Sequence, residues 1–223
     1  MVREQELRHI RSGCLVLVRH GETAWNRDEV FRGRADVPLN ENGRAQAQAV
    51  AHALEHEPVG AVYSSPLSRA LETAKYIADV HSLPVITHEG LVDFDCGEWQ
   101  GKTLSQVRQG YADLFQQWTD APHTVELPGG ETLDQVRQRA VQAVLEIFRA
   151  NDSATIAAVT HRVVSKVLLC ALLGLDNSHF WNIFQSNACT NRIVFGRHGP
   201  EIHSLNDVSH LAHAGTDVLT RDF

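Results

Sequence analysis

The segment 15–18, Leu-Val-Leu-Val, runs without interruption into Arg19, His20 and Gly21. A short apolar run bounded by a glycine is typical of a buried strand. Such a strand carries Arg19 and His20 to its carboxyl end, which in an open parallel sheet is the edge where ligands bind. Arginine is a planar cation that suits phosphate, and histidine can act as a nucleophile. The sequence therefore predicts an anion-binding site at the end of its first strand.

Similar patterns predict the elements that follow. Strands are expected at 59–63, 84–87 and 154–160, and the last of these ends on His161. The extended segments 192–195 and 201–205 are typical of a late hairpin. A buried helix is expected at 163–173. The other helix starts are marked by capping signals, at Asn40, at Ser65 before Pro66, and at the Thr-x-x-Gln boxes of Thr103 and Thr132.

The length of the chain is compatible with one α/β domain. It has 223 residues, of which 43% are hydrophobic and 21% charged, and this is enough for a real core. We expect a single domain over 1–223, with a mobile lead-in at 1–12, a lid-like insert at about 94–130 and a tail at 206–223. The loop 22–40 is rich in charge, glycine and proline, and it is expected to cover the site.

Composition argues against several classes of function. The formal net charge is -7, so the chain lacks the basic footprint of a nucleic-acid-binding protein. Its longest apolar run, 167–173, is too short to span a bilayer, and the charged segment 1–12 does not resemble a signal peptide. We therefore expect a cytoplasmic protein without a membrane partner. The four cysteines form no Cys-x-x-Cys pair and are expected to be reduced, and no residue cluster has metal-ligand spacing.

The motif around His20 extends well beyond three residues. Arg19-His20-Gly21-Glu22-Thr23 is followed by Trp25-Asn26, Phe31-Arg32-Gly33, Pro38-Leu39 and Asn42-Gly43-Arg44, and segment 64–74 is Ser-Ser-Pro-Leu-x-Arg-Ala-x-x-Thr-Ala. Together these resemble the signature of the histidine phosphatase superfamily, which includes the cofactor-dependent phosphoglycerate mutases. A second Arg-His-Gly copy, at 197–199, lacks this extension and is predicted to be the turn of the late hairpin.

The resemblance implies a three-layer α/β/α sandwich whose mixed sheet is mostly parallel, with an antiparallel strand from the late hairpin. It also implies a metal-independent phosphatase, without a cofactor, that acts on small phosphorylated metabolites through a phosphohistidine on His20. Arg19, Arg69 and His161 can surround one phosphoryl group, because arginine forks supply both positioning and charge stabilisation. Thr23 and Asn26 match family positions that touch the phosphate or its loop. The oligomeric state is open, with a homo-oligomer as one alternative.

The proton donor departs from the family pattern. In the segment 91–101, Asp93 stands where the family usually has Glu, within a Leu-x-Glu motif followed by Gly-x-Trp-x-Gly. Aspartate is one methylene shorter, and burial or nearby negative charge must favour its protonated form if it is to act as an acid near neutrality. Asp93 is the favoured acid, and Asp95 and Glu98 are the alternatives.

The roles of two arginines near the predicted site are also open. Arg162 follows His161 where the family commonly has glycine, and Arg32 precedes Gly33. Each of these cations either contacts the substrate or extends into solvent. Arg32, Gly33 and Arg162 are therefore included among the predicted substrate-binding residues.

Two alternatives to a phosphatase stay open at this point. A phosphoglycerate mutase shares the nucleophile but passes the phosphoryl group back to substrate, and mutases typically carry a larger insert than 94–130. A non-catalytic module that binds phosphorylated ligands keeps the arginines and has lost acid catalysis at Asp93. Hydrolysis of a generic aryl phosphate separates the phosphatase from the binding module.

Overall fold

The computed structural model describes residues 2–214 and 216, and within them six strands form one mixed sheet. The strands are β1 (Cys14–Arg19), β2 (Val59–Ser64), β3 (Val85–Thr87), β4 (Thr155–Thr160), β5 (Thr190–Gly196) and β6 (Gly199–Asp207). Their order across the sheet is β3-β2-β4-β1-β5-β6. Strands β3, β2, β4 and β1 are parallel, whereas β5 is antiparallel to both of its neighbours. The predicted mixed sheet and its antiparallel strand are confirmed.

Strand β1 lies between two apolar cores. All of its residues are buried. Leu15 and Leu17 pack into one core, while Val16 and Val18 pack into the other. Side chains alternate between the two faces of a strand, so a strand that is apolar at every position needs cover on both faces.

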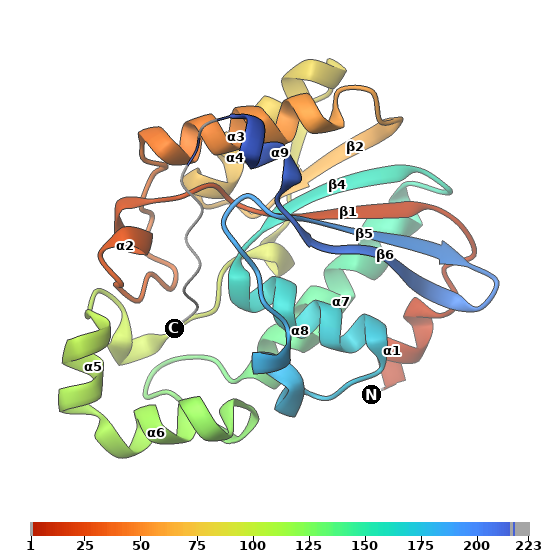
Figure 1. The fold of residues 1–223 in the computed structure, drawn as a ribbon. Helices are drawn as coiled ribbons and strands as arrows, with labels where there is room; N and C mark the ends of the chain where they lie inside the picture. The colour runs from red at the N-terminus through yellow and green to blue at the C-terminus, as the bar shows by residue number, and fades with distance from the viewer. Residues whose placement is uncertain (1, 215, 217–223) are drawn as a thin grey trace.

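Helices provide that cover and complete three layers (Figure 1). One face carries α3 (Glu41–Leu54), α4 (Ser68–His81) and the short α9 (Ser209–His213). The other face carries α1 (Val2–Leu7), α7 (Leu133–Ala150) and α8 (Arg162–Leu173). The cap predicted at Asn40 is confirmed, since its side chain accepts from the Gly43 N–H at 2.7 Å. The predicted α/β/α sandwich is likewise confirmed.

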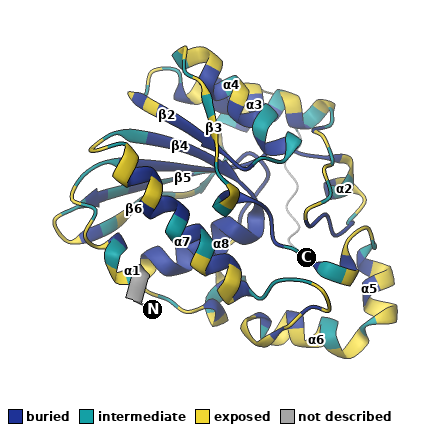
Figure 2. Ribbon diagram, turned by 180° about the vertical axis from the view of Figure 1, so that it is seen from behind, coloured by how far each residue is buried: buried dark blue, intermediate teal, exposed yellow. Residues whose placement is uncertain are grey.

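The insert forms a group of short elements beyond the carboxyl ends of β1, β2 and β4 (Figure 1). It contains η2 (Gly97–Trp99), α5 (Leu104–Gly110), α6 (Ala112–Asp120) and η3 (Pro122–Thr124). Much of α5 and α6 is exposed (Figure 2). Trp118 attaches α6 to the body, with ring centroids 5.7 Å from Phe94 and 5.4 Å from Phe180. The remaining short helices are α2 (Ala24–Arg27), η1 (Glu89–Leu91) and η4 (Asn177–Asn182).

The structure corrects the prediction of a mobile lead-in at 1–12. Residues 2–7 form α1, and Leu7 is buried in the core. The Glu4 carboxylate accepts hydrogen bonds from Arg137 Nε at 2.7 Å and from Arg137 Nη2 at 2.9 Å. An apolar anchor and a bidentate ion pair therefore hold this segment against α7.

Two helix boundaries also differ from the prediction. Helix α4 begins at Ser68, because the Ser65 hydroxyl binds a histidine across the sheet and Leu67 occupies the N-cap position. The helix expected after Thr103 is two helices, α5 and α6, separated at Tyr111, where φ is -138° and ψ is 45°. The capping boxes of Thr103 and Thr132 are both present as predicted.

Within the predicted tail at 206–223, β6 ends at Asp207 and α9 follows. Residues 215 and 217–223 lie outside the described part of the chain. No helix among the described residues is long and apolar enough to cross a membrane. All four cysteines are buried, and none of them forms a disulfide.

Candidate active site

Three adjacent parallel strands end at one edge of the sheet, and each is followed by a polar residue. His20 follows β1 and His161 follows β4. Ser65 follows β2. The His20 N–H donates to the Thr160 carbonyl at 3.0 Å, which continues the ladder past the strand ends. The sheet thus brings the two imidazoles together, with ring centroids 5.1 Å apart.

The two ring nitrogens of His20 have different surroundings. Nδ1 lies 2.6 Å from the Gly21 carbonyl oxygen, which can only accept a hydrogen bond. We therefore assign the proton to Nδ1 and the lone pair to Nε2, which is buried without a hydrogen-bond partner among the described residues. Burial, followed by the charges of Arg69, His161 and Arg19, lowers the pKa of His20 well below its usual value. His20 is thus a neutral imidazole whose lone pair can attack an electrophile.

Arg69, in the first turn of α4, is fully buried at the same edge. Its Nη1 donates to the Ala35 carbonyl at 2.8 Å, and its Nη2 donates to the Gly33 carbonyl at 3.0 Å and to the Asp93 carboxylate at 2.9 Å. Its Nε is buried without a hydrogen-bond partner in the described part of the chain. Arg69 therefore holds the loop at 33–35 against the site and retains a donor for an anion.

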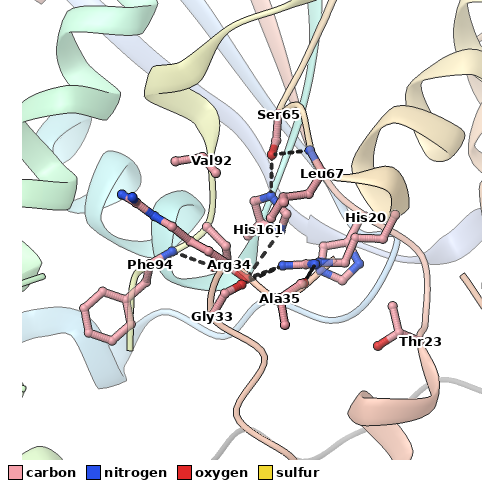
Figure 3. A network of polar contacts seen from close by, with 12 residues as sticks. His20, Thr23, Gly33, Arg34, Ala35, Ser65, Leu67, Val92, Phe94 and His161 are labelled. Carbon is pink, nitrogen blue, oxygen red and sulfur yellow. Dashed lines mark hydrogen bonds and ion pairs between the residues drawn. The ribbon is translucent and has the colours of Figure 1, made fainter. Parts of the chain in front are cut away.

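Asp93 connects this arginine to the second histidine. Its Oδ2 lies 3.4 Å from His161 Nδ1, and its Oδ1 accepts from the Phe94 N–H at 2.9 Å. The other ring nitrogen of His161, Nε2, lies 2.7 Å from the Ser65 hydroxyl (Figure 3). Burial and the charge of Arg69 are the largest causes that lower the pKa of His161. The contact with Ser65 was missed by sequence reasoning, which predicted Ser65 only as a helix cap.

The two alternative acids have other partners. Asp95 lies 3.8 Å from Arg34 Nη1, and Glu98 accepts a hydrogen bond from the Tyr111 hydroxyl at 3.0 Å. Asp93 is the one of the three that contacts the buried arginine and histidine. The geometry therefore favours Asp93 as the proton donor.

Thr23 and Asn26 are buried and bind each other. The Asn26 Oδ1 accepts from the Thr23 N–H at 3.0 Å and from the Thr23 hydroxyl at 2.9 Å. The amide of Asn187 reaches the same oxygen at 3.4 Å. Sequence reasoning missed Asn187 and also Gln185, whose carbonyl accepts from Arg19. The signal available was the polar Gln-Ser-Asn triplet at 185–187 before the predicted hairpin.

Arg32, Gly33 and Arg162 lie around a small cavity at the edge of the site. Gly33 has a φ of +51°, and a Cβ there would lie 2.7 Å from the Cys96 Sγ, so a larger residue would be strained. Arg32 is only 8% exposed, and burial, followed by the charge of Arg19, lowers its pKa to about 9. Arg162, the first residue of α8, is also 8% exposed. Neither arginine extends freely into solvent.

The site carries positive charge from its own arginines. The described residues contain no group of three or more His, Cys, Asp or Glu side chains that could hold a metal ion. Guanidinium groups supply this charge. Helices α4 and α8 also begin beside the site, and the dipole at a helix amino terminus favours anions. This arrangement suits an anion of phosphate size next to the lone pair of His20.

Comparisons with known proteins agree with this geometry. Residues 15–208 match the model of the histidine phosphatase superfamily (branch 1). Phosphoserine phosphatase 1 of Hydrogenobacter thermophilus is 36% identical over 197 residues, which cover 88% of this chain and 93% of that protein. A metal-independent phosphoserine phosphatase of Arabidopsis thaliana is 33% identical over 213 residues, with coverages of 94% and 87%. Among solved structures, Bacillus stearothermophilus YhfR has a TM-score of 0.85 and 34% identity, with coverages of 89% and 99%.

Proposed function

The chain belongs to the histidine phosphatase superfamily (branch 1), and on that premise we propose that it hydrolyses small phosphomonoesters through a phosphohistidine on His20. The observation that supports this most strongly is the state of His20 Nε2. This nitrogen is buried, carries a lone pair, and has no hydrogen-bond partner among the described residues. A buried nucleophile beside arginines is the arrangement that phosphoryl transfer through a covalent intermediate requires.

In the first half of the reaction, His20 Nε2 attacks phosphorus. The bond between phosphorus and the alcohol oxygen breaks, and protonated Asp93 gives its proton to that oxygen. Arg19, Arg69 and His161 donate to the phosphoryl oxygens and stabilise the charge that spreads over them.

In the second half, a water molecule attacks phosphorus on the opposite side from His20. The Asp93 carboxylate accepts a proton from this water, and the phosphorus–nitrogen bond breaks. Inorganic phosphate leaves, while Asp93 is again protonated and His20 is again neutral. Thr23 and Asn26, which bind each other, hold the loop that follows the nucleophile in place.

We propose that the enzyme needs neither a metal nor an organic cofactor, because its own guanidinium groups supply the charge that a metal ion would supply. The name of the Arabidopsis relative, a metal-independent phosphoserine phosphatase, supports this part of the proposal. In finer terms, the chain is a phosphoric monoester hydrolase of the histidine acid phosphatase type. Its partner is a small phosphorylated metabolite, and phosphoserine is the first substrate to try because two relatives are named for it.

Hydrolysis assays separate this function from its two rivals. A phosphatase releases phosphate from p-nitrophenyl phosphate and from phosphoserine, whereas a binding module releases none. A mutase interconverts phosphoglycerates, and it does so faster when bisphosphoglycerate is added. Phosphate release from neither substrate would refute the proposal, and so would mutase activity that exceeds hydrolysis.

A further inference from the structure

The reacting groups define where the rest of a substrate must lie. In the proposed mechanism phosphorus is next to His20, and the leaving oxygen is next to Asp93. The alcohol that carries this oxygen therefore extends into the space beside Asp93. A cavity of about 30 Å³ lies there, and its walls include Arg32, Phe94 and Arg162.

Two of the residues that line this cavity have buried donors without partners in the described part of the chain. Nε and Nη1 of Arg32 have no hydrogen-bond partner among the described residues, and the same is true of Nε1 of Trp118, which lies on α6. A buried donor that stays unpaired costs free energy, so a ligand bound in this cavity is expected to supply hydrogen-bond acceptors. Arg162 contributes a second guanidinium group to the same wall.

The proposed mechanism assigns Arg19 and Arg69 to the phosphoryl group. Arg19 is the last residue of β1, and Arg69 lies in the first turn of α4. Arg32 and Arg162 line the cavity that Asp93 also lines, and Asp93 is the residue beside the leaving oxygen in that mechanism. The cavity has room for about two water molecules, which is also the space that the two oxygens of a carboxylate fill.

We propose that this cavity binds a carboxylate on the leaving alcohol through Arg32 and Arg162, with the indole N–H of Trp118 as a third donor. Planar guanidinium forks match carboxylates in a bidentate way. The substrate class is therefore the phosphate ester of a hydroxy acid, not that of a neutral polyol. This inference rests on the proposed phosphatase function and specifies the substrate of the same site.

A matched pair of substrates tests the proposal. 3-Phosphoglycerate carries a carboxylate where glycerol 3-phosphate carries a hydroxymethyl group. For the wild-type protein, kcat/KM should favour 3-phosphoglycerate by more than about tenfold, which is the size of effect expected for a charge-assisted hydrogen bond. Arg32→Gln and Arg162→Gln should each lower this preference by about tenfold or more. Arg27→Gln, which changes an exposed arginine of α2, is the matched control and should keep the wild-type preference.

Two results would overturn the inference. One is a wild-type preference near one. The other is an equal loss on both substrates in Arg32→Gln and Arg162→Gln, which would mean that these arginines act only on the phosphoryl group. If a thermal melt shows that Arg32→Gln does not fold, Arg162→Gln decides alone.

Failure of the proposed function gives a different result. In that case wild-type protein does not hydrolyse even p-nitrophenyl phosphate. Calorimetric binding of 3-phosphoglycerate and glycerol 3-phosphate to the wild-type protein then decides whether the cavity prefers a carboxylate. Equal affinities for the two compounds would overturn the inference.

Discussion

Replacing Asp93 with Asn removes the proton that the leaving alcohol needs while it keeps the shape of the side chain. One carboxylate oxygen accepts from the Phe94 N–H at 2.9 Å, and the other accepts from Arg69 at 2.9 Å. Asparagine offers one acceptor and one donor, so a donor faces a donor at one of these two contacts. This mismatch should cost about 1–3 kcal/mol of unfolding free energy, which a domain of ordinary stability tolerates.

The catalytic cost should depend on the leaving group. General acid catalysis contributes about 10²–10⁴-fold, which corresponds to roughly 3–5 kcal/mol of activation free energy. An alkyl alkoxide needs that proton, and a nitrophenolate hardly does. The step in which the alcohol leaves sets kcat/KM, whereas hydrolysis of the phosphohistidine is the same for every substrate. Asp93→Asn should therefore lower kcat/KM on phosphoserine by about 10²–10⁴-fold and lower kcat/KM on p-nitrophenyl phosphate by less than about tenfold.

The assay measures kcat/KM on both substrates for the wild type, for Asp93→Asn and for the matched controls Asp95→Asn and Glu98→Gln. Urea unfolding of each variant checks that it is folded. Both controls should keep the wild-type ratio of the two kcat/KM values, because their carboxylates bind Arg34 and Tyr111. Equal losses of kcat/KM on the two substrates in Asp93→Asn would refute the acid role, and a loss confined to phosphoserine in a control would assign that role to its residue.

Three further predictions follow from the site. Activity on phosphoserine should survive prolonged dialysis against a chelator. A loss of activity that added magnesium or zinc restores would contradict the proposal that guanidinium groups replace a metal ion. Arg69→Ala should weaken inhibition by vanadate by more than about tenfold and lower kcat/KM by roughly 10²–10³-fold, because the variant loses a buried donor to the phosphoryl oxygens. Unchanged inhibition by vanadate would show that Arg69 does not bind the phosphoryl group. The pKa values of His20 and His161 are lowered in the folded protein, so below about pH 6.5 these side chains take up protons only in the unfolded chain. The unfolding free energy of the ligand-free protein should therefore fall as the pH falls. The expected loss is roughly 1 kcal/mol per histidine between about pH 6.5 and 5.5. Urea unfolding of wild type and His161→Gln measures this slope, and an equal slope in the variant would contradict it.

The sheet and its nucleophile could be predicted because their signals are local. A strand that is apolar at every position must lie between two layers, and the residue that follows it must lie at the sheet edge. The caps at Asn40 and Thr132 are equally local, because each binds a backbone N–H three residues further on. These features need only short stretches of sequence.

Other features depend on partners far away in the chain. Glu4 and Arg137 are separated by 133 positions, and this pair attaches α1 to α7. Ser65 and His161 are 96 positions apart, so a pattern that predicts a helix cap cannot anticipate the cross-sheet contact. Asn187 lies 161 positions from Asn26 and outside any recognisable motif. These contacts are consequences of strand order, which helix and strand periodicity do not encode.

Arg69 shows how the two kinds of information combine. Helical periodicity alone places it off the apolar stripe of α4, where a solvated arginine is the ordinary expectation. In the structure it is fully buried, because the carbonyls of Gly33 and Ala35 and the carboxylate of Asp93 accept its hydrogen bonds. The family motif identified this residue, and the loop at 33–35 supplies the physical reason for its burial.

A phosphoryl group bound to His20 is the intermediate on which the proposed mechanism depends. Brief mixing with radiolabelled substrate, followed by a rapid quench and peptide mapping, measures that intermediate. Wild-type protein should carry label that acid removes and base does not, on the peptide that contains His20. His198→Ala, in the exposed second copy of the motif, should be labelled like wild type, whereas His20→Ala should show neither label nor turnover. Acid-stable label, label on another peptide, or wild-type turnover by His20→Ala would contradict the account.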